Sequence, residues 1–157
     1  MADPEQLAER YVAAVDAFAE ALRAIPTEQM DFRESATSWS ARDIAFHVAD
    51  VDQLLGLRLR RILSDDYPEI AGVNTHGNVE QFRRIRADRS LALDALGGSS
   101  AINAALIEVL QPDQVNRKGR HPHGHDVTAV DIAMFCSLHI EAHVKQLARI
   151  MKAAGAG

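Results

Sequence analysis

The sequence has a single cysteine, few aromatic residues and no surplus of basic side chains. One cysteine excludes an intramolecular disulfide, which is consistent with a reducing compartment. A formal net charge of -5 argues against a general nucleic-acid binder, because no basic surplus can neutralise phosphates. No run approaches about 18 apolar residues, and the acidic N-terminus lacks the apolar segment of a signal peptide. We therefore expect a cytoplasmic protein that binds neither nucleic acid nor membranes.

The remaining composition favours one helical domain. A chain of 157 residues has the length of a single domain with a sizeable core, so we expect one domain over residues 1–157. Aromatic residues make up only 5%, whereas alanine and leucine are abundant, which favours helices over sheet. No internal repeat or low-complexity segment divides the chain.

Apolar residues recur at helical spacing in four long stretches of the chain. We expect helices over residues 4–25, 41–63, 78–110 and 128–151, with a short helical turn within residues 27–33. Asp3 and Ser40 precede the first and second of these stretches, Thr128 begins the last, and all three have the side chains of N-cap residues. The pair Gly97-Gly98 interrupts the third stretch, so we expect that helix to be kinked or broken there.

Two long connections separate the predicted helices. Residues 64–77 contain proline, glycine and asparagine and are expected to form a surface connection. Residues 111–127 are expected to form a polar loop. Four helices with one long crossover between the second and the third predict an all-α four-helix bundle.

The last predicted helix carries two histidines on its apolar stripe. His139 and His143 are four residues apart, so their imidazoles lie on one face of the helix and can reach a common point. That spacing is typical of metal ligands. Glu141 lies about 200° round the helix from His139 and should face away, so the zinc-protease motif H-E-x-x-H is not formed.

A third ligand has to come from another helix, and His47 is the best candidate. It shares one side of the second predicted helix with Ile44 and Val48. If the two helices pack side by side, the three imidazoles converge and leave an open coordination position, as in catalytic sites. The alternative is that the histidines are core residues of a metal-free bundle, as lone histidines on apolar stripes usually are.

Polar residues near the histidines have candidate supporting roles. Asp43 and Asp50 flank His47, and either could accept a hydrogen bond from the far ring N–H of that ligand. The alternative for both is a solvated helix face, and Asp43 also fits a helix cap. Gln146, three residues after His143, is a candidate for the pocket wall or for a hydrogen bond to a ligand.

Three further residues are candidates for catalysis or substrate binding. Cys136 lies one turn before the histidine pair and is a candidate nucleophile, with a small buried residue as the alternative. Asp50 and Gln146 are the other candidates for a catalytic role. Arg86 and Arg89 fall near the inward side of the third helix and could hold an anionic substrate, or form a solvated face.

Three histidines cluster in the polar loop before the last helix. His121, His123 and His125 could form a second metal site, although a flexible polar loop is the simpler interpretation. One of them could instead lean over the metal pocket as a proton carrier, because histidine titrates near neutral pH. His76 is expected at the surface.

The order of these motifs resembles the DinB/YfiT-like superfamily over roughly residues 8–150. The resemblance rests on Trp39-Ser40, on His47 eight residues after the tryptophan, and on His139-x-x-x-His143-x-x-Gln146. The loop over residues 121–128 looks like the family's His-Pro-x-x-Gly-x-x-Thr segment, shortened by one residue.

The resemblance implies a four-helix bundle with one divalent metal ion, commonly zinc or nickel, on three histidines. Carried over to this chain, the ligands are His47, His139 and His143. Members of the family are often homodimers. Characterised branches include transferases and isomerases that act with low-molecular-weight thiols as co-substrates.

Two classes of function therefore stand beside each other. The first is a metal-dependent enzyme for small molecules, of the thiol-dependent transferase type or, as an alternative, a hydrolase. The second is a non-enzymatic bundle that binds a metal ion or ligand, because the sequence offers no unmistakable general base besides the ligands.

Overall fold

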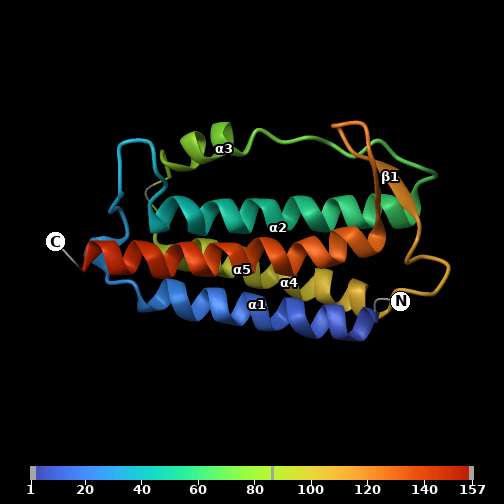
Figure 1. The fold of residues 1–157 in the computed structure, drawn as a ribbon, viewed down its shortest axis with the longest axis horizontal. Helices are drawn as coiled ribbons and strands as arrows, with labels where there is room; N and C mark the ends of the chain where they lie inside the picture. The colour runs from blue at the N-terminus through green and yellow to red at the C-terminus, as the bar shows by residue number, and fades with distance from the viewer. Residues whose placement is uncertain (1–2, 86, 156–157) are drawn as a thin grey trace.

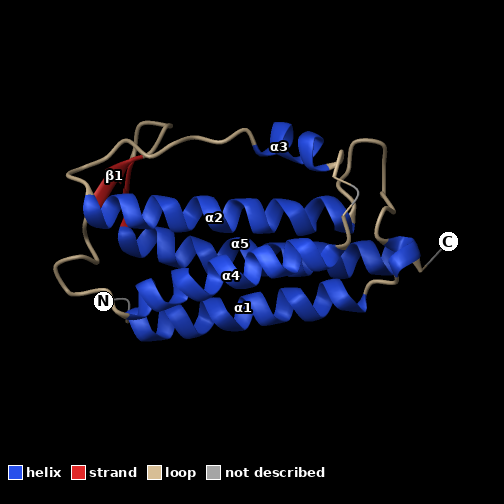
Figure 2. Ribbon diagram, turned by 180° about the vertical axis from the view of Figure 1, so that it is seen from behind, coloured by secondary structure: helices blue, strands red, loops and turns tan. Residues whose placement is uncertain are grey.

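The computed structural model describes residues 3–85 and 87–155. Its elements are α1 (Pro4–Ala24), a 3-10 turn η1 (Thr27–Gln29), α2 (Ala41–Ser64), α3 (Thr75–Phe82), α4 (Arg89–Glu108), β1 (Lys118–Arg120), β2 (Asp126–Thr128) and α5 (Ala129–Ala154). The four long helices lie side by side, with α1 and α2 each packed against both α4 and α5 (Figures 1 and 2). The crossover from α2 to α4 carries α3 along the outside of α2. The predicted four-helix bundle with a long crossover is thus confirmed.

The helix starts follow the predicted capping chemistry. Asp3 accepts a hydrogen bond from the backbone N–H of Glu5 at the start of α1. Ser40 with Asp43 and Thr128 with Asp131 form reciprocal capping boxes at the starts of α2 and α5. Each box satisfies backbone N–H groups that a helix N-terminus otherwise leaves unpaired. The caps fix where the helices that carry the candidate ligands begin.

The break in the third predicted helix lies between the end of α3 at Phe82 and the start of α4 at Arg89, and not at the glycines. α4 runs without interruption through Gly97 and Gly98, both of which are exposed. The Asp88 carboxylate caps the new helix by accepting a hydrogen bond from the Ser90 N–H. Arg89 donates to the carbonyls of Leu22 and Ile25 at the end of α1. The prediction of a kink at the glycines was wrong, because packing outweighs their weak helix propensity.

Replacing either Gly97 or Gly98 by alanine should stabilise the protein by about 0.5–1 kcal/mol. A Cβ atom at either position would meet no heavy atom within 4 Å, so only the gain in helix propensity remains. Urea unfolding of the two variants checks this expectation. A variant less stable than the parent would show that the glycines are required by the backbone. Gly56→Ala is the contrasting case, because its Cβ would lie 2.0 Å from Asn103 Oδ1.

The predicted polar loop before the last helix contains a short antiparallel hairpin of β1 and β2. Gly119 opposes Val127 in this hairpin. Arg120 joins the hairpin to the crossover, since its N–H donates to Pro68 O at 2.8 Å and its carbonyl accepts from Ile70 N–H at 3.0 Å. Three-residue strands leave no clear alternation in a sequence, so the loop interpretation was wrong for these residues. The connection between the two strands, residues 121–125, forms the hairpin tip and carries His121, His123 and His125. The hairpin holds this tip beside α2 and the crossover.

The carboxylate of Asp52 is buried between the helices. Asp52 on α2 is 1% exposed and accepts hydrogen bonds from Tyr11 Oη, Ser99 Oγ and Asn103 Nδ2. Burial raises the pKa of Asp52, while the three hydrogen bonds oppose that rise by favouring the charged form. The network therefore ties α1, α2 and α4 together through a single acceptor.

Candidate metal centre

The structure brings the three predicted imidazoles together at the interface of α2 and α5. His139 Nε2 lies 3.0 Å from His47 Nε2 and 3.1 Å from His143 Nε2. The three candidate ligand atoms all lie within 4.8 Å of one another. His47 is only 5% exposed, and the two histidines of α5 are half-buried. Side-by-side packing of the two helices produces this convergence, as the sequence predicted.

The spacing of the nitrogen atoms fits one small cation. Ligands at about 2.0–2.1 Å from a tetrahedral ion lie about 3.4 Å from each other, close to the separations seen. Gln146 Oε1 lies 2.8 Å from His143 Nδ1 and accepts its proton in a hydrogen bond. That bond fixes the tautomer, so His143 Nε2 presents a lone pair to its neighbours. The His143 lone pair faces His139 Nε2 at 3.1 Å, the orientation that a metal ligand in this cluster needs.

Burial keeps the histidines neutral. Burial, together with the nearby His143 and His76, lowers the pKa of His47 to about 4. Burial, together with the neighbouring His143 and His47, lowers the pKa of His139 to about 3. Burial also lowers the pKa of His143, against the hydrogen bond to Gln146. Neutral imidazoles at pH 7 are the protonation state that binds metal ions.

Two aromatic rings shield the histidine cluster. The ring of Trp39, just before α2, lies 4.6 Å from the His47 ring and 6.5 Å from that of His143. The Phe135 ring lies 5.7 Å from the His139 ring. Phe135 was not predicted from the sequence, although it lies four residues before His139, a spacing that places two side chains on one face of a helix. Both rings limit the access of water to the cluster.

A cavity of about 300 Å³ opens beside His47 and His139. The apolar part of its wall comes from α2, α5, the crossover and the hairpin tip: Val51, Leu54, Leu55, Val73, Pro122 and Phe135. His121 and His123 line the same cavity. An apolar cavity that reaches a cluster of metal ligands has the character of a small-molecule site.

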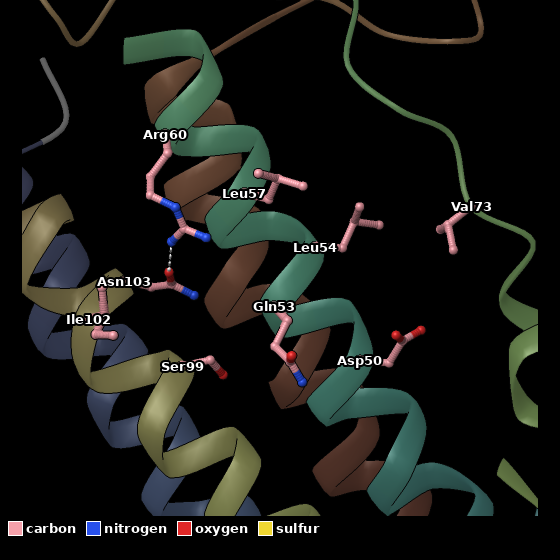
Figure 3. Close-up of a pocket in the computed structure, with 9 residues that line it drawn as sticks. All are labelled: Asp50, Gln53, Leu54, Leu57, Arg60, Val73, Ser99, Ile102 and Asn103. Carbon is pink, nitrogen blue, oxygen red and sulfur yellow. Dashed lines mark hydrogen bonds between the residues drawn. The ribbon is translucent and has the colours of Figure 1, made fainter. Parts of the chain in front are cut away.

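Neither candidate aspartate forms a hydrogen bond with His47 in the described part of the chain. Asp43 is buried at the N-terminus of α2, where Arg33 and Arg83 approach its carboxylate at 3.2 and 2.9 Å. Asp50 accepts a hydrogen bond of 2.9 Å from Asn78 Nδ2. Asp50 also lines a separate hollow of about 450 Å³ between α2 and α4 (Figure 3). The expected support of His47 by these carboxylates was wrong, because arginine, capping and amide partners hold them.

Cys136 and Arg89 do not face the cavity, and Arg86 lies outside the described residues. Cys136 is 2% exposed in the core, and burial raises the pKa of its thiol, which makes it a poor nucleophile. The guanidinium of Arg89 is bound to backbone carbonyls of α1, including that of Leu22 at 2.7 Å. Arg89 therefore connects the start of α4 to the end of α1 and does not hold a ligand.

The loop histidines lie on the hairpin tip beside the cavity. His125 stacks on His121 with ring centroids 4.5 Å apart. Burial lowers the pKa of His121, and the neighbouring His125 and Arg58 lower it further. His76 is exposed as expected, with its ring 5.2 Å from that of Trp39. Of these residues, His121 and His123 are placed to exchange protons with a molecule in the cavity.

Replacing Gln146 by alanine should weaken metal binding about 10–100-fold, because the hydrogen bond that fixes the His143 tautomer is lost. The matched control is Gln53→Ala, which removes an exposed amide bonded only to the Ala49 carbonyl of its own helix. Competition titration with a metal-binding dye gives both affinities. Equal affinities for the two variants would contradict the proposed role of Gln146.

Comparison with known proteins agrees with the fold. The family model of the DinB superfamily matches residues 10–147. The solved structure of YfiT from Bacillus subtilis, described as a probable metal-dependent hydrolase with an unusual four-helix bundle topology, is similar with a TM-score of 0.83. That match has 22% identity and covers 95% of this chain and 87% of YfiT. A DinB-like protein from the same species, YjoA, is similar with a TM-score of 0.65 and 17% identity, over 96% of this chain and 92% of the other. No curated protein matches the sequence.

Proposed function

The chain belongs to the DinB superfamily, and from that premise we propose that it is a metal-dependent enzyme catalysing thiol-dependent group transfer on small organic molecules. The observation that carries the proposal is the convergence of three neutral imidazole Nε2 atoms beside an apolar cavity. His47, His139 and His143 would hold one divalent ion, with zinc or nickel as the candidates. Such an ion would supply positive charge at the cavity and would lower the pKa of a thiol or water molecule bound there.

The residues of the cavity suit a thiol co-substrate. No carboxylate lines this cavity within the described ranges, so no acidic side chain is placed there as a general base. A thiol with a lowered pKa needs only a group to take its proton, and His121 and His123 are within the same cavity. The apolar wall excludes water and orients an organic substrate. His121 can later return the proton to the leaving group.

Hydrolysis is the second candidate. It is favoured by the description of YfiT as a probable metal-dependent hydrolase and by the similarity of the two folds. The same three histidines and the same cavity would then serve water in place of a thiol. The two reactions differ in a measurable way, because only the first consumes a thiol.

The test is metal analysis of protein purified without added metal, followed by turnover assays on wild type and His143→Ala. We expect one divalent ion per chain and a metal-dependent transfer of a thiol to an electrophilic substrate, lost in the variant. Turnover of esters or amides without thiol would support the hydrolase instead. Full metal loading without turnover on either class would support a non-enzymatic binding protein. Wild type that binds no metal would overturn the proposal.

Metal affinity should change little between pH 8 and pH 6 and fall at lower pH. Protons compete with the metal only when the histidines are protonated, and the pKa values of His47 and His139 are lowered to about 4 and about 3. Histidines with the ordinary pKa of about 6.5 would lose affinity steeply below pH 6.5. Isothermal titration at several pH values, corrected for buffer binding, distinguishes the two. A loss of tenfold or more between pH 7 and pH 6 would contradict the neutral, buried cluster.

A further inference from the structure

We propose that the cavity beside the three histidines binds elongated carboxylates, with Arg58 holding the carboxylate at the end away from the histidines. This inference rests on the proposed function in one respect: the end of the ligand opposite the carboxylate would lie at the proposed metal site. It assigns a binding residue that the sequence patterns did not indicate.

The cavity follows one face of α2. His47, Val51, Leu55 and Arg58 all line it, and their separations of four, eight and eleven residues place them on one side of the helix. Eleven residues span about 16 Å along a helix axis, and the Arg58 side chain leans back toward the helix N-terminus. The guanidinium and the histidine cluster therefore lie at opposite ends of a mainly apolar wall.

Arg58 has hydrogen-bonding capacity to spare. It is half-buried, and its Nε and Nη2 atoms donate to the Ala71 carbonyl at 3.2 and 2.6 Å. Within the described ranges no carboxylate lies within 4.0 Å of it, and no hydrogen-bond partner is present for Nη1. The Ala71 carbonyl fixes the guanidinium at the cavity wall but does not neutralise it. A partly buried charge without a counter-ion favours an anionic ligand.

The charge of the site matches a carboxylate. Arg58 is the one arginine or lysine that lines this cavity in the described structure, and the neighbouring His121 has a lowered pKa and is neutral at pH 7. One positive charge neutralises a carboxylate, whereas a phosphate dianion would need a second cation. The planar guanidinium also suits the planar carboxylate geometrically.

The larger neighbouring hollow between α2 and α4 does not combine a partly buried arginine with a wall free of carboxylates. Figure 3 shows Arg60 pointing toward Asn103, whose Oδ1 atom lies 3.4 Å from Arg60 Nη1. Asp50 lines the same hollow, which therefore contains a carboxylate, and the Arg60 side chain is exposed to solvent. Arg60 is therefore the matched control for Arg58, since it lies two residues away on the same helix and faces a different space.

The experiment compares 6-mercaptohexanoate with 6-mercaptohexanol on the cobalt-loaded protein. Cobalt–thiolate absorption reports binding at the histidines, and the two probes differ only in the carboxylate. Wild type should bind the acid at least about tenfold more tightly than the alcohol, the margin of one charge-assisted pair. Arg58→Gln should remove this preference, and Arg60→Gln should retain it. Mercaptoacetate is too short to reach Arg58, so its binding should be unchanged in Arg58→Gln.

Equal binding of acid and alcohol by wild type, or a preference that survives in Arg58→Gln, would overturn the inference. If the protein binds no cobalt, the proposed function fails, and the Arg58 site is then tested on metal-free protein. In that case hexanoate should shift the side-chain Nε–H resonance of Arg58 saturably, and hexanol should not. No shift with hexanoate would overturn the inference separately. Circular dichroism checks the fold of Arg58→Gln, and Arg58→Lys, which keeps the charge, should keep part of the preference.

Discussion

Replacing His139 by alanine should lower the affinity for a divalent ion by roughly three orders of magnitude. His139 Nε2 is the central atom of the cluster, since it lies 3.0 and 3.1 Å from the other two nitrogen atoms. A protein zinc site of four ligands has a binding free energy of about 10–16 kcal/mol, so one ligand accounts for about 3–4 kcal/mol. The ion would keep only two protein ligands, one from each of α2 and α5.

Chelator competition on wild type and His139→Ala measures this loss. The control is His76→Ala, which removes an exposed histidine near Trp39 that is not part of the cluster. We expect the control to bind within about threefold of wild type, since it removes no ligand. Affinity of His139→Ala within tenfold of wild type would show that the ion is held elsewhere.

Replacing Asp52 by alanine should destabilise the protein by roughly 3–5 kcal/mol, the second large effect. The variant leaves the buried hydroxyl of Tyr11 without its acceptor and removes one of the two acceptors of the Asn103 amide, which keeps its bond to the backbone carbonyl of residue 52. It also opens a small cavity between the helices. Groups that are buried without a partner incur the full cost of desolvation.

Urea unfolding of Asp52→Ala gives the change in the free energy of unfolding. Asp94→Ala on the exposed side of α4 is the control, and we expect it to lie within about 0.5 kcal/mol of the parent. A loss below about 1 kcal/mol for Asp52→Ala would show that water or a rearranged side chain satisfies the network.

The bundle and the histidine cluster could be predicted because helices show their inward face in the sequence. His47, His139 and His143 occupy positions that a plain core helix gives to apolar residues, so their direction followed from helical periodicity. Gln146 was within reach of His143 for the same reason. Local chemistry also specified the caps, because a capping box is formed by residues three apart.

The parts that sequence reasoning missed depend on contacts between distant segments. The start of α4 is held by the bond of Arg89 to carbonyls at the end of α1, some 60 residues earlier in the chain. The hairpin is joined to the crossover through Arg120 and Pro68. Arg58 lines the site only because the crossover and the hairpin tip enclose that face of α2. Periodicity within one helix gives no information on such contacts.

Asp43 and Asp50 show a second limit on what sequence spacing can predict. Asp43 and Asp50 lie at spacings from His47 that allow a hydrogen bond, yet Arg83 and Asn78 bind them. Spacing along a helix gives a shared face only approximately, and partners from α3 and its flanking residues decide where each carboxylate points. The sequence could therefore indicate the ligands themselves more reliably than the groups that support them.

The most direct test of the central claim is a crystal structure of the metal-loaded protein with anomalous diffraction at the metal edge. We predict a single strong anomalous peak per chain, with His47, His139 and His143 Nε2 each about 2.0–2.1 Å from it. A peak at the hairpin histidines instead, or none at the cluster under saturating metal, would contradict the account.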